Sequence, residues 1–156
     1  MLYWRQILTD FRFESDKILL CSKIAESKVF VFGEEFIEIV IEGDTFDDAY
    51  HAAVLECDAL GKIFIHPFND EKVIEGQATI GLEILQQATE PIDYVFLAVG
   101  GGGLAAGLST VFKIESPKTK IIGVEPEGAP SMSLSIKNNK NTPLKHIEKF
   151  VDGAAV

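Results

Sequence analysis

Four consecutive glycines, Gly100–Gly103, are the residues of this chain whose type and spacing point most directly to chemistry. They follow an apolar, strand-like segment, Tyr94–Val99, and open an Ala/Leu-rich segment with helical spacing. Glycines at the start of a helix leave several backbone N–H groups pointing into one concavity, beside the positive end of the helix dipole. A tight turn requires one or two glycines, so a run of four favours a phosphate cradle over a turn without a ligand.

Three kinds of phosphate-binding site could explain this glycine loop. A P-loop is disfavoured, because Leu104 and Ala105 stand where that motif needs Lys and Ser or Thr. A dinucleotide-binding turn fits the spacing Gly100-x-Gly102-x-x-Ala105, and Glu125 ends the next strand where an acid contacts a ribose, although no other dinucleotide feature follows it. The third interpretation is a cradle that wraps a single phosphate group with backbone donors. The spacing of these residues alone is therefore compatible with NAD and with a ligand that has a single phosphate group.

Strand-like and helix-like segments alternate around the loop from about residue 33 onward. Strands are predicted at 36–41, 62–65, 94–99 and 120–125, and helices at 46–60, 73–87 and 104–114. Thr45 is predicted to cap the first helix. This alternation predicts an α/β fold, a parallel sheet with helices on both faces. Ligands of such sheets bind at the carboxyl ends of strands, where the glycine loop and Glu125 both lie.

Composition narrows the class of protein. The 156 residues are 47% hydrophobic and carry a formal charge of −10, which argues for about one globular domain and against nucleic acid as a partner. No apolar run has the length of a membrane span, and charged residues interrupt the start of the chain where a signal peptide would be apolar. Cys21 and Cys57 lie far apart, so a reduced, cytoplasmic setting is expected, with Cys57 a buried thiol on the apolar face of a helix.

His66 lies in a loop that contains Pro67, after the second predicted strand. A lone histidine there is either a catalytic acid or a contact to a neighbouring domain. We favour a structural role in the loop over catalysis.

Blocks of sequence in a fixed order resemble the fold-type II pyridoxal-phosphate enzymes, and within them the threonine dehydratases of isoleucine biosynthesis. The similarity spans about residues 33–156. The matching blocks are Glu42–Asp47, Phe64–Asp70, Gly76–Ile80, Val95–Leu104, Ile121–Pro126 and Phe150–Val156.

The resemblance implies a cofactor, pyridoxal phosphate, and a set of residues that bind it. The tetraglycine loop of the family holds the cofactor phosphate, and its Phe-x-Asp-Gly segment approaches the cofactor ring. The residues with these implied roles are Gly100, Gly101, Gly102, Gly103, the backbone of Leu104, and Gly153.

A cation site of some relatives is not expected in this chain. The positions that match it are Glu125, Ala129 and Ser131, and serine replaces an anionic ligand there. No metal ligands are therefore predicted.

The family's Schiff-base lysine, in a Ser-Phe-Lys type motif followed by Asn-His, has no match in this chain. The early lysines, Lys17, Lys23 and Lys28, lie in unrelated surroundings, so no catalytic residue is predicted. The chain is therefore expected to be a truncated central fragment of a threonine dehydratase, the enzyme that converts threonine to 2-oxobutanoate and ammonia, and to be inactive alone.

The resemblance also predicts how the chain is divided. Residues 1–32 remain unassigned, 33–66 form part of a small domain, and 67–156 form part of the large cofactor-binding domain. Such a slice of a parallel sheet is expected to leave apolar faces uncovered and strand edges unpaired. The alternative function is therefore a non-catalytic binding module or complementing fragment, with a homo-oligomer possible, and NAD binding is the third.

Overall fold

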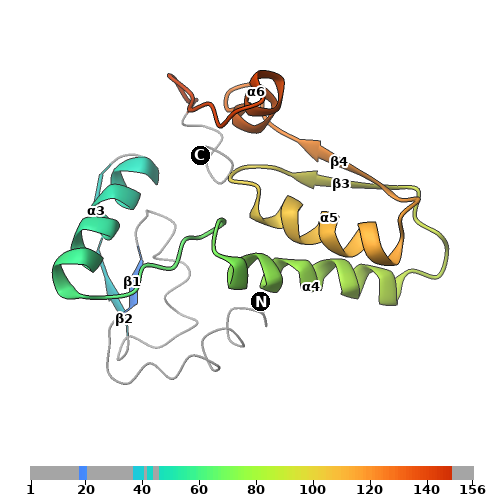
Figure 1. The fold of residues 1–156 in the computed structure, drawn as a ribbon, viewed down its shortest axis with the longest axis horizontal. Helices are drawn as coiled ribbons and strands as arrows, with labels where there is room; N and C mark the ends of the chain where they lie inside the picture. Colours follow the sequence, from blue (N-terminus) through green and yellow to red (C-terminus); the bar gives the residue numbers. More distant parts are fainter. Residues whose placement is uncertain (1–17, 21–36, 41, 44–45, 149–156) are drawn as a thin grey trace. The chain divides into compact units, whose positions relative to one another are not determined.

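The structure, a computed structural model, describes residues 18–20, 37–40, 42–43 and 46–148. The chain divides into two compact units, Met1–Phe64 and Ile65–Val156 (Figure 1). Thr45, Cys21 and Gly153 lie outside the described residues, as do the three early lysines. Within the described part, no helix is both long and apolar enough to cross a membrane.

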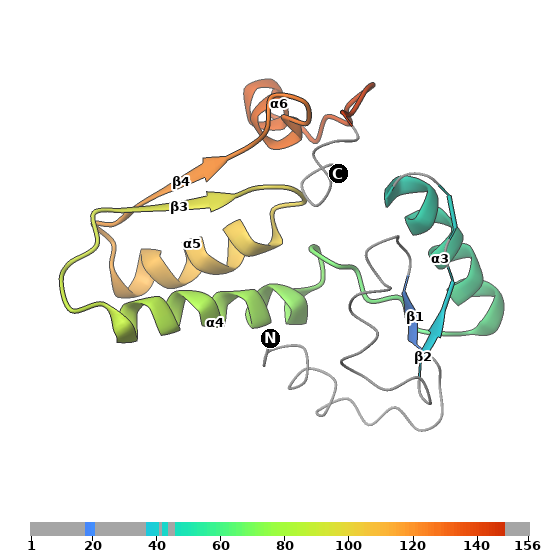
Figure 2. The same ribbon diagram turned by 180° about the vertical axis from the view of Figure 1, so that it is seen from behind.

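The described residues of the first unit form a short parallel strand pair and one helix (Figure 2). Strand β1 (Ile18–Leu20) pairs with β2 (Ile37–Ile39), and Ile18 lies opposite Ile37. The predicted strand at 36–41 is therefore present at Ile37–Ile39, and of its remaining residues only Val40 is described, outside the strand. The sequence does not predict the β1 strand, because no turn or capping residues frame this segment.

Helix α3 (Phe46–Leu60) has the bounds that helical spacing predicted. Ala53 and Cys57 lie four residues apart on its buried face, which confirms Cys57 as a buried thiol. Gly61 ends the helix in a left-handed conformation with φ +66°, and the Lys62 N–H donates to the Cys57 carbonyl at 2.8 Å. This is the Schellman arrangement that terminates many helices.

The predicted strand at 62–65 is wrong, because this segment has no regular secondary structure. Its β-branched residues favour extended backbone, but a strand also needs a neighbour to pair with. The Lys62 N–H is already used to close α3, and the Ile63 side chain is 87% exposed.

Between residues 65 and 148, the second unit forms two strands and three helices. In chain order they are α4 (Glu71–Gln87), β3 (Tyr94–Ala98), α5 (Gly103–Glu115), β4 (Lys120–Val124) and α6 (Ser131–Asn138). Strands β3 and β4 pair in parallel, with Tyr94 opposite Lys120, and α5 is the crossover between them. The predicted parallel α/β arrangement is thereby confirmed.

Helix α4 begins two residues before the predicted start because Asp70 caps it. The Asp70 carboxylate accepts hydrogen bonds from the N–H groups of Lys72 at 2.8 Å and Val73 at 3.2 Å. An Asp before an acidic first turn commonly marks the start of a helix. The predicted start at residue 73 rested on the spacing of apolar residues and did not take this cap into account.

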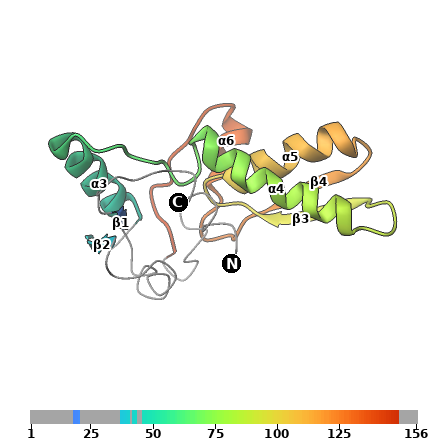
Figure 3. The same cartoon turned by 90° about the horizontal axis from the view of Figure 1, so that it is seen from below.

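The core of the second unit forms where α4 and α5 pack on one side of the strand pair. Its buried centre consists of Leu97, Val99, Leu108 and Phe112, and Phe112 is only 1% exposed. Helices α4 and α5 run side by side (Figure 3). Their closest approach is at Gly107, where an added Cβ would lie 2.7 Å from the Ala78 nitrogen. Only glycine permits this spacing.

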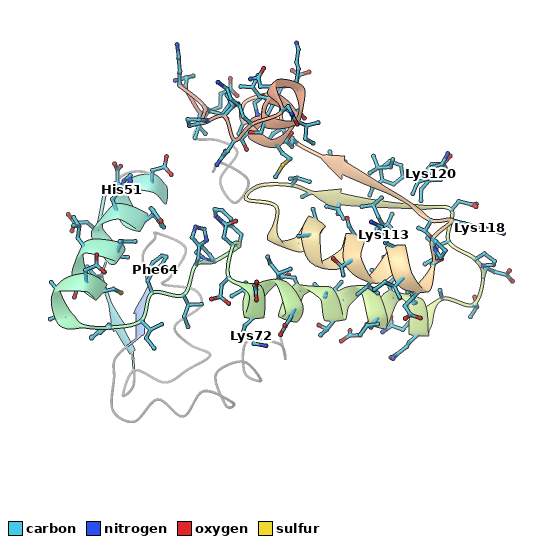
Figure 4. The ribbon with its side chains drawn as sticks, viewed as in Figure 1. His51, Phe64, Lys72, Lys113, Lys118 and Lys120 are labelled. Atoms are coloured by element: carbon cyan, nitrogen blue, oxygen red, sulfur yellow. The ribbon has the colours of Figure 1, made fainter. Side chains whose placement is uncertain are left out.

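The other side of the strand pair is bare within the described residues. Tyr94 is 52%, Phe96 68% and Val124 51% exposed, and the three project from alternate positions along β3 and β4. The Lys120 ammonium lies 5.4 Å from the centre of the Tyr94 ring at one end of this face (Figure 4). The uncovered apolar face that the sequence predicted is therefore present.

Candidate functional site

The glycine loop connects β3 to the first turn of α5. Gly102 is the N-cap of α5 and adopts a left-handed conformation with φ +89°, which glycine adopts without strain. No side chain caps this helix, and no acidic residue lies in its first turn. The first-turn N–H groups of a helix have no acceptor within the helix, so this terminus suits an anion. A phosphate group fits the donors present here.

Close neighbours also require glycine in this loop. A Cβ on Gly101 would lie 2.3 Å from the Phe68 ring, and one on Gly103 would lie 3.0 Å from the Phe68 backbone. A Cβ on Gly102 would lie 2.8 Å from the end of the Met132 side chain. The loop is therefore held between the segment before α4 and helix α6. Neither neighbour was identified from sequence, because nothing local marks a contact between distant segments.

His66 is an acceptor in the turn that carries Phe68. Its Nδ1 atom accepts hydrogen bonds from the N–H groups of Phe68 at 3.3 Å and Asn69 at 3.2 Å. Burial lowers the pKa of His66, and the nearby Asp70 carboxylate opposes this in part. The ring is therefore neutral at pH 7, as an accepting Nδ1 requires. These contacts support the structural role over the catalytic one.

Glu125, at the end of β4, caps helix α6. Its Oε1 atom accepts from the Met132 N–H at 2.7 Å, and its Oε2 atom accepts from the Ser133 N–H at 2.7 Å and from the Ser133 hydroxyl. The local N-cap residue, Pro130, offers no side-chain acceptor. Helix α6 is not predicted from the sequence, because its cap comes from Glu125, which directly follows β4, rather than from the residue adjacent to the helix.

The hydrogen bonds of Glu125 are relevant to two of the ligands considered above, the ribose of NAD and a cation. Both carboxylate oxygens accept hydrogen bonds from α6, so the position of Glu125 at this edge has a structural reason that does not require a ribose. The matching cation positions include Ala129, which is 1% exposed, and Ser131, which begins α6. Across the described ranges, no three His, Cys, Asp or Glu residues gather where they could hold a metal ion.

We expect Glu125→Gln to destabilise the second unit at neutral pH by about 0.5–2 kcal/mol, the usual size of a lost helix cap. Burial raises the pKa of Glu125, but the hydrogen bonds from Ser133 and Met132 outweigh it and leave the pKa below the ordinary value of 4.5. The stabilisation is therefore complete above that ordinary value and is lost as the pH falls through the lowered pKa of the folded state. Urea unfolding of both proteins at pH 7 and at lower pH should show the difference shrink. An equal difference at both pH values would contradict the role of the charge.

Comparison with known proteins places the chain in a family. The pyridoxal-phosphate dependent enzyme family matches residues 22–156. The chain therefore belongs to the family of pyridoxal-phosphate-dependent enzymes.

Its similar proteins include biosynthetic threonine dehydratases. The L-threonine dehydratase biosynthetic IlvA of Halalkalibacterium halodurans is 49% identical over 125 residues, which cover 80% of this chain and 30% of the relative. That of Bacillus subtilis is 48% identical over 130 residues, which cover 83% of this chain and 31% of the relative. This chain thus spans less than a third of the length of either relative.

A solved structure shows the same arrangement of elements. The processed form of threonine deaminase isoform 2 from Solanum lycopersicum matches with a TM-score of 0.82 and 35% identity. The match covers 99% of this chain and 52% of the tomato chain. This similarity confirms the fold class expected from the sequence.

Proposed function

We propose that this chain is part of a threonine dehydratase and that its glycine loop binds the phosphate of pyridoxal phosphate. The donors are the backbone N–H groups of Gly100–Gly103 and Leu104, and Gly153 approaches the cofactor ring. The observation that carries the proposal is the uncapped start of α5, which is formed by the glycine run and contains no acidic residue. The 49% identity to a threonine dehydratase supports the choice of cofactor and substrate.

Binding at this loop relies on backbone dipoles rather than on a charged side chain. The phosphate dianion would accept hydrogen bonds from the first-turn N–H groups, and the dipole of α5 would favour its charge. Pyridoxal phosphate, when bound, supplies the electron sink that stabilises negative charge on the α-carbon of an amino acid. The protein must supply the base that moves the α-proton.

Four of the described lysines are not suited to be that base, and the sequence contains no match to the family's Schiff-base lysine motif. Lys113 lies ten residues beyond Gly103, or about 15 Å along the helix at 1.5 Å per residue. Lys118 and Lys120 follow that far end of α5, as Figure 4 shows. Lys72 pairs with Glu75 at 2.8 Å, and this hydrogen bond raises the pKa of Lys72, which keeps it protonated. We therefore propose that the chain alone does not turn over threonine.

The remaining assignments follow from the same proposal. Residues 33–66 belong to the small domain and 67–156 to the large, cofactor-binding domain. The protein acts in the cytoplasm, as part of amino-acid metabolism, and nucleic acid is not a partner.

Pyridoxal phosphate is expected to raise the melting temperature of the purified chain, whereas pyridoxal, which lacks the phosphate, is not. A ligand at 100 times its dissociation constant stabilises the folded state by about 2.7 kcal/mol. Circular dichroism melts with each compound measure the shift. Gly102→Val, which puts a branched side chain at φ +89° and against Met132, should remove the shift. A melt that does not respond to either compound would contradict the phosphate cradle.

A second proposed function is that of a complementing fragment, favoured by the bare apolar face of β3 and β4. Parallel strands are normally covered on both faces, and here Phe96 is 68% exposed. The occupant we propose is the remainder of the large domain, which the relatives contain and this chain does not match.

Complementation is tested by co-expression with the unmatched part of the Halalkalibacterium halodurans relative. We expect a stable complex that converts threonine to 2-oxobutanoate, and we expect Phe96→Asp to prevent its formation. Two separate monomers after co-purification would refute this function.

A further inference from the structure

We propose that His66 is a positioning residue for the glycine loop: through the turn that it closes, it holds Phe68 against Gly101 and Gly103. The effect on cofactor binding rests on the proposed function, whereas the effect on the loop itself does not. No catalytic step is assigned to His66.

The first link is the hydrogen bonding of the His66 ring. Nδ1 accepts from two successive backbone N–H groups, those of Phe68 and Asn69, at 3.3 and 3.2 Å. Since Nδ1 accepts, the neutral ring carries its hydrogen on Nε2, which is then a donor and forms no hydrogen bond with the Asn69 Nδ2 atom 3.4 Å away, itself a donor. The ring therefore fixes the conformation of this turn through the two hydrogen bonds that Nδ1 accepts.

The second link is the contact between Phe68 and the glycine loop. The His66 and Phe68 rings lie edge to face, with centroids 4.4 Å apart and planes at 80°. The Phe68 ring occupies the space that a Cβ on Gly101 would need, and the Phe68 backbone lies against Gly103. Any shift of Phe68 by a side-chain width would open this contact and release the loop from one side.

The third link is that the other end of the same segment is fixed independently. Asp70 accepts from the N–H groups of Lys72 and Val73 and so anchors the segment to the start of α4. Phe68 lies between this anchor and His66. The position of Phe68 therefore depends on whether Nδ1 of His66 accepts its two hydrogen bonds.

Protonation of His66 would break this arrangement, because both nitrogens of the charged ring are donors. Burial lowers the pKa of His66, and Asp70 is the charged group that acts against this within the described residues. The folded state therefore favours the neutral ring. This contribution to stability is complete above the ordinary pKa of about 6.5 and is lost as the pH falls from there through the lowered pKa.

Two matched substitutions separate the hydrogen bonds of Nδ1 from the bulk of the ring. In His66→Asn the side-chain oxygen can accept from the two following N–H groups, as in an Asx turn. In His66→Gln the longer side chain places its amide nearer the position of Nε2. The comparison is amide hydrogen exchange at Ala106, whose N–H donates to the Gly102 carbonyl of the loop at 2.9 Å, with Phe112 in the buried part of α5 as the internal control.

We expect exchange at Ala106 to become about tenfold faster in His66→Gln, as the loss of two hydrogen bonds implies, and to stay near the wild-type rate in His66→Asn. Exchange at Phe112 should be unchanged in both variants. Equal exchange at Ala106 in wild type and His66→Gln would overturn the proposal. Equal acceleration in both variants would also overturn it, because the acceptor atom would then not matter.

A pH titration of the wild-type protein tests the same coupling without any variant, and so does not depend on whether the variants fold. The amide resonances of Gly101 and Gly103 are expected to shift below about pH 6.5 with the midpoint of the His66 ring. Glycine resonances that do not follow His66 would refute the coupling.

Pyridoxal phosphate affinity, measured on the same proteins, addresses the proposed function separately. If the wild-type protein does not bind pyridoxal phosphate, the proposed cofactor site is refuted, but the hydrogen-exchange result still tests the role of His66. Binding by wild type and His66→Asn, with weaker binding by His66→Gln, is the result expected if both proposals hold.

Discussion

Replacing Phe112 with alanine is expected to lower the free energy of unfolding of the second unit by about 3–5 kcal/mol, the usual cost of truncating a buried phenylalanine. The side chain is 1% exposed and lies with Leu97, Val99 and Leu108 in the buried centre between α5 and the strands. This centre joins the end of β3 to α5, the two elements that flank the glycine loop. Urea unfolding, followed by circular dichroism, measures the loss.

Phe96→Ala is the matched control for this substitution. It removes the same side-chain atoms from a residue that is 68% exposed on the bare face of β3. A change within about 0.5 kcal/mol is expected, as for most surface substitutions. Equal destabilisation by the two variants would show that the buried centre does not lie where the structure places it.

Replacing Gly107 with alanine is expected to destabilise the protein by about 1–3 kcal/mol, although alanine is the better helix former. The added Cβ would lie 2.7 Å from the Ala78 nitrogen and 2.8 Å from the Ile74 carbonyl oxygen, both backbone atoms of α4. Backbone cannot rotate out of the way, so the two helices must separate. Thermal and urea unfolding measure the effect.

Thr110→Ala tests the same helix at an exposed position. Its side chain hydrogen-bonds to the Ala106 carbonyl at 2.8 Å and is exposed. We expect little change in stability or a small gain, because alanine has the higher helix propensity. Stabilisation by Gly107→Ala similar to that of Thr110→Ala would mean that α4 and α5 do not approach closely.

Helices α4 and α5 of the second unit could be predicted from sequence because the signals for each lie within its own segment. Apolar spacing gave α4 and α5 to within two residues, and the alternation with strands gave the parallel pairing of β3 and β4. The glycine loop was found for the same reason, since the run of glycines and its neighbouring segments are adjacent in the chain.

The remaining features depend on contacts between distant residues. Helix α6 forms with a cap from Glu125, and residues 62–65 fail to form a strand because Lys62 completes α3 instead. The contacts of Phe68 and Met132 with the glycine loop likewise join segments that only the fold brings together. Contacts between distant segments leave no mark in the local sequence. The glycine loop could therefore be predicted, but the residues that position it could not.

The central claim, that the glycine loop is a phosphate site, is tested most directly by titrating the isotope-labelled chain with pyridoxal phosphate and following its amide resonances. We predict saturable shifts concentrated at Gly101, Gly102, Gly103 and Leu104, with none of comparable size on addition of pyridoxal. Shifts of the same size with both compounds, or shifts that do not include these four amides, would contradict it.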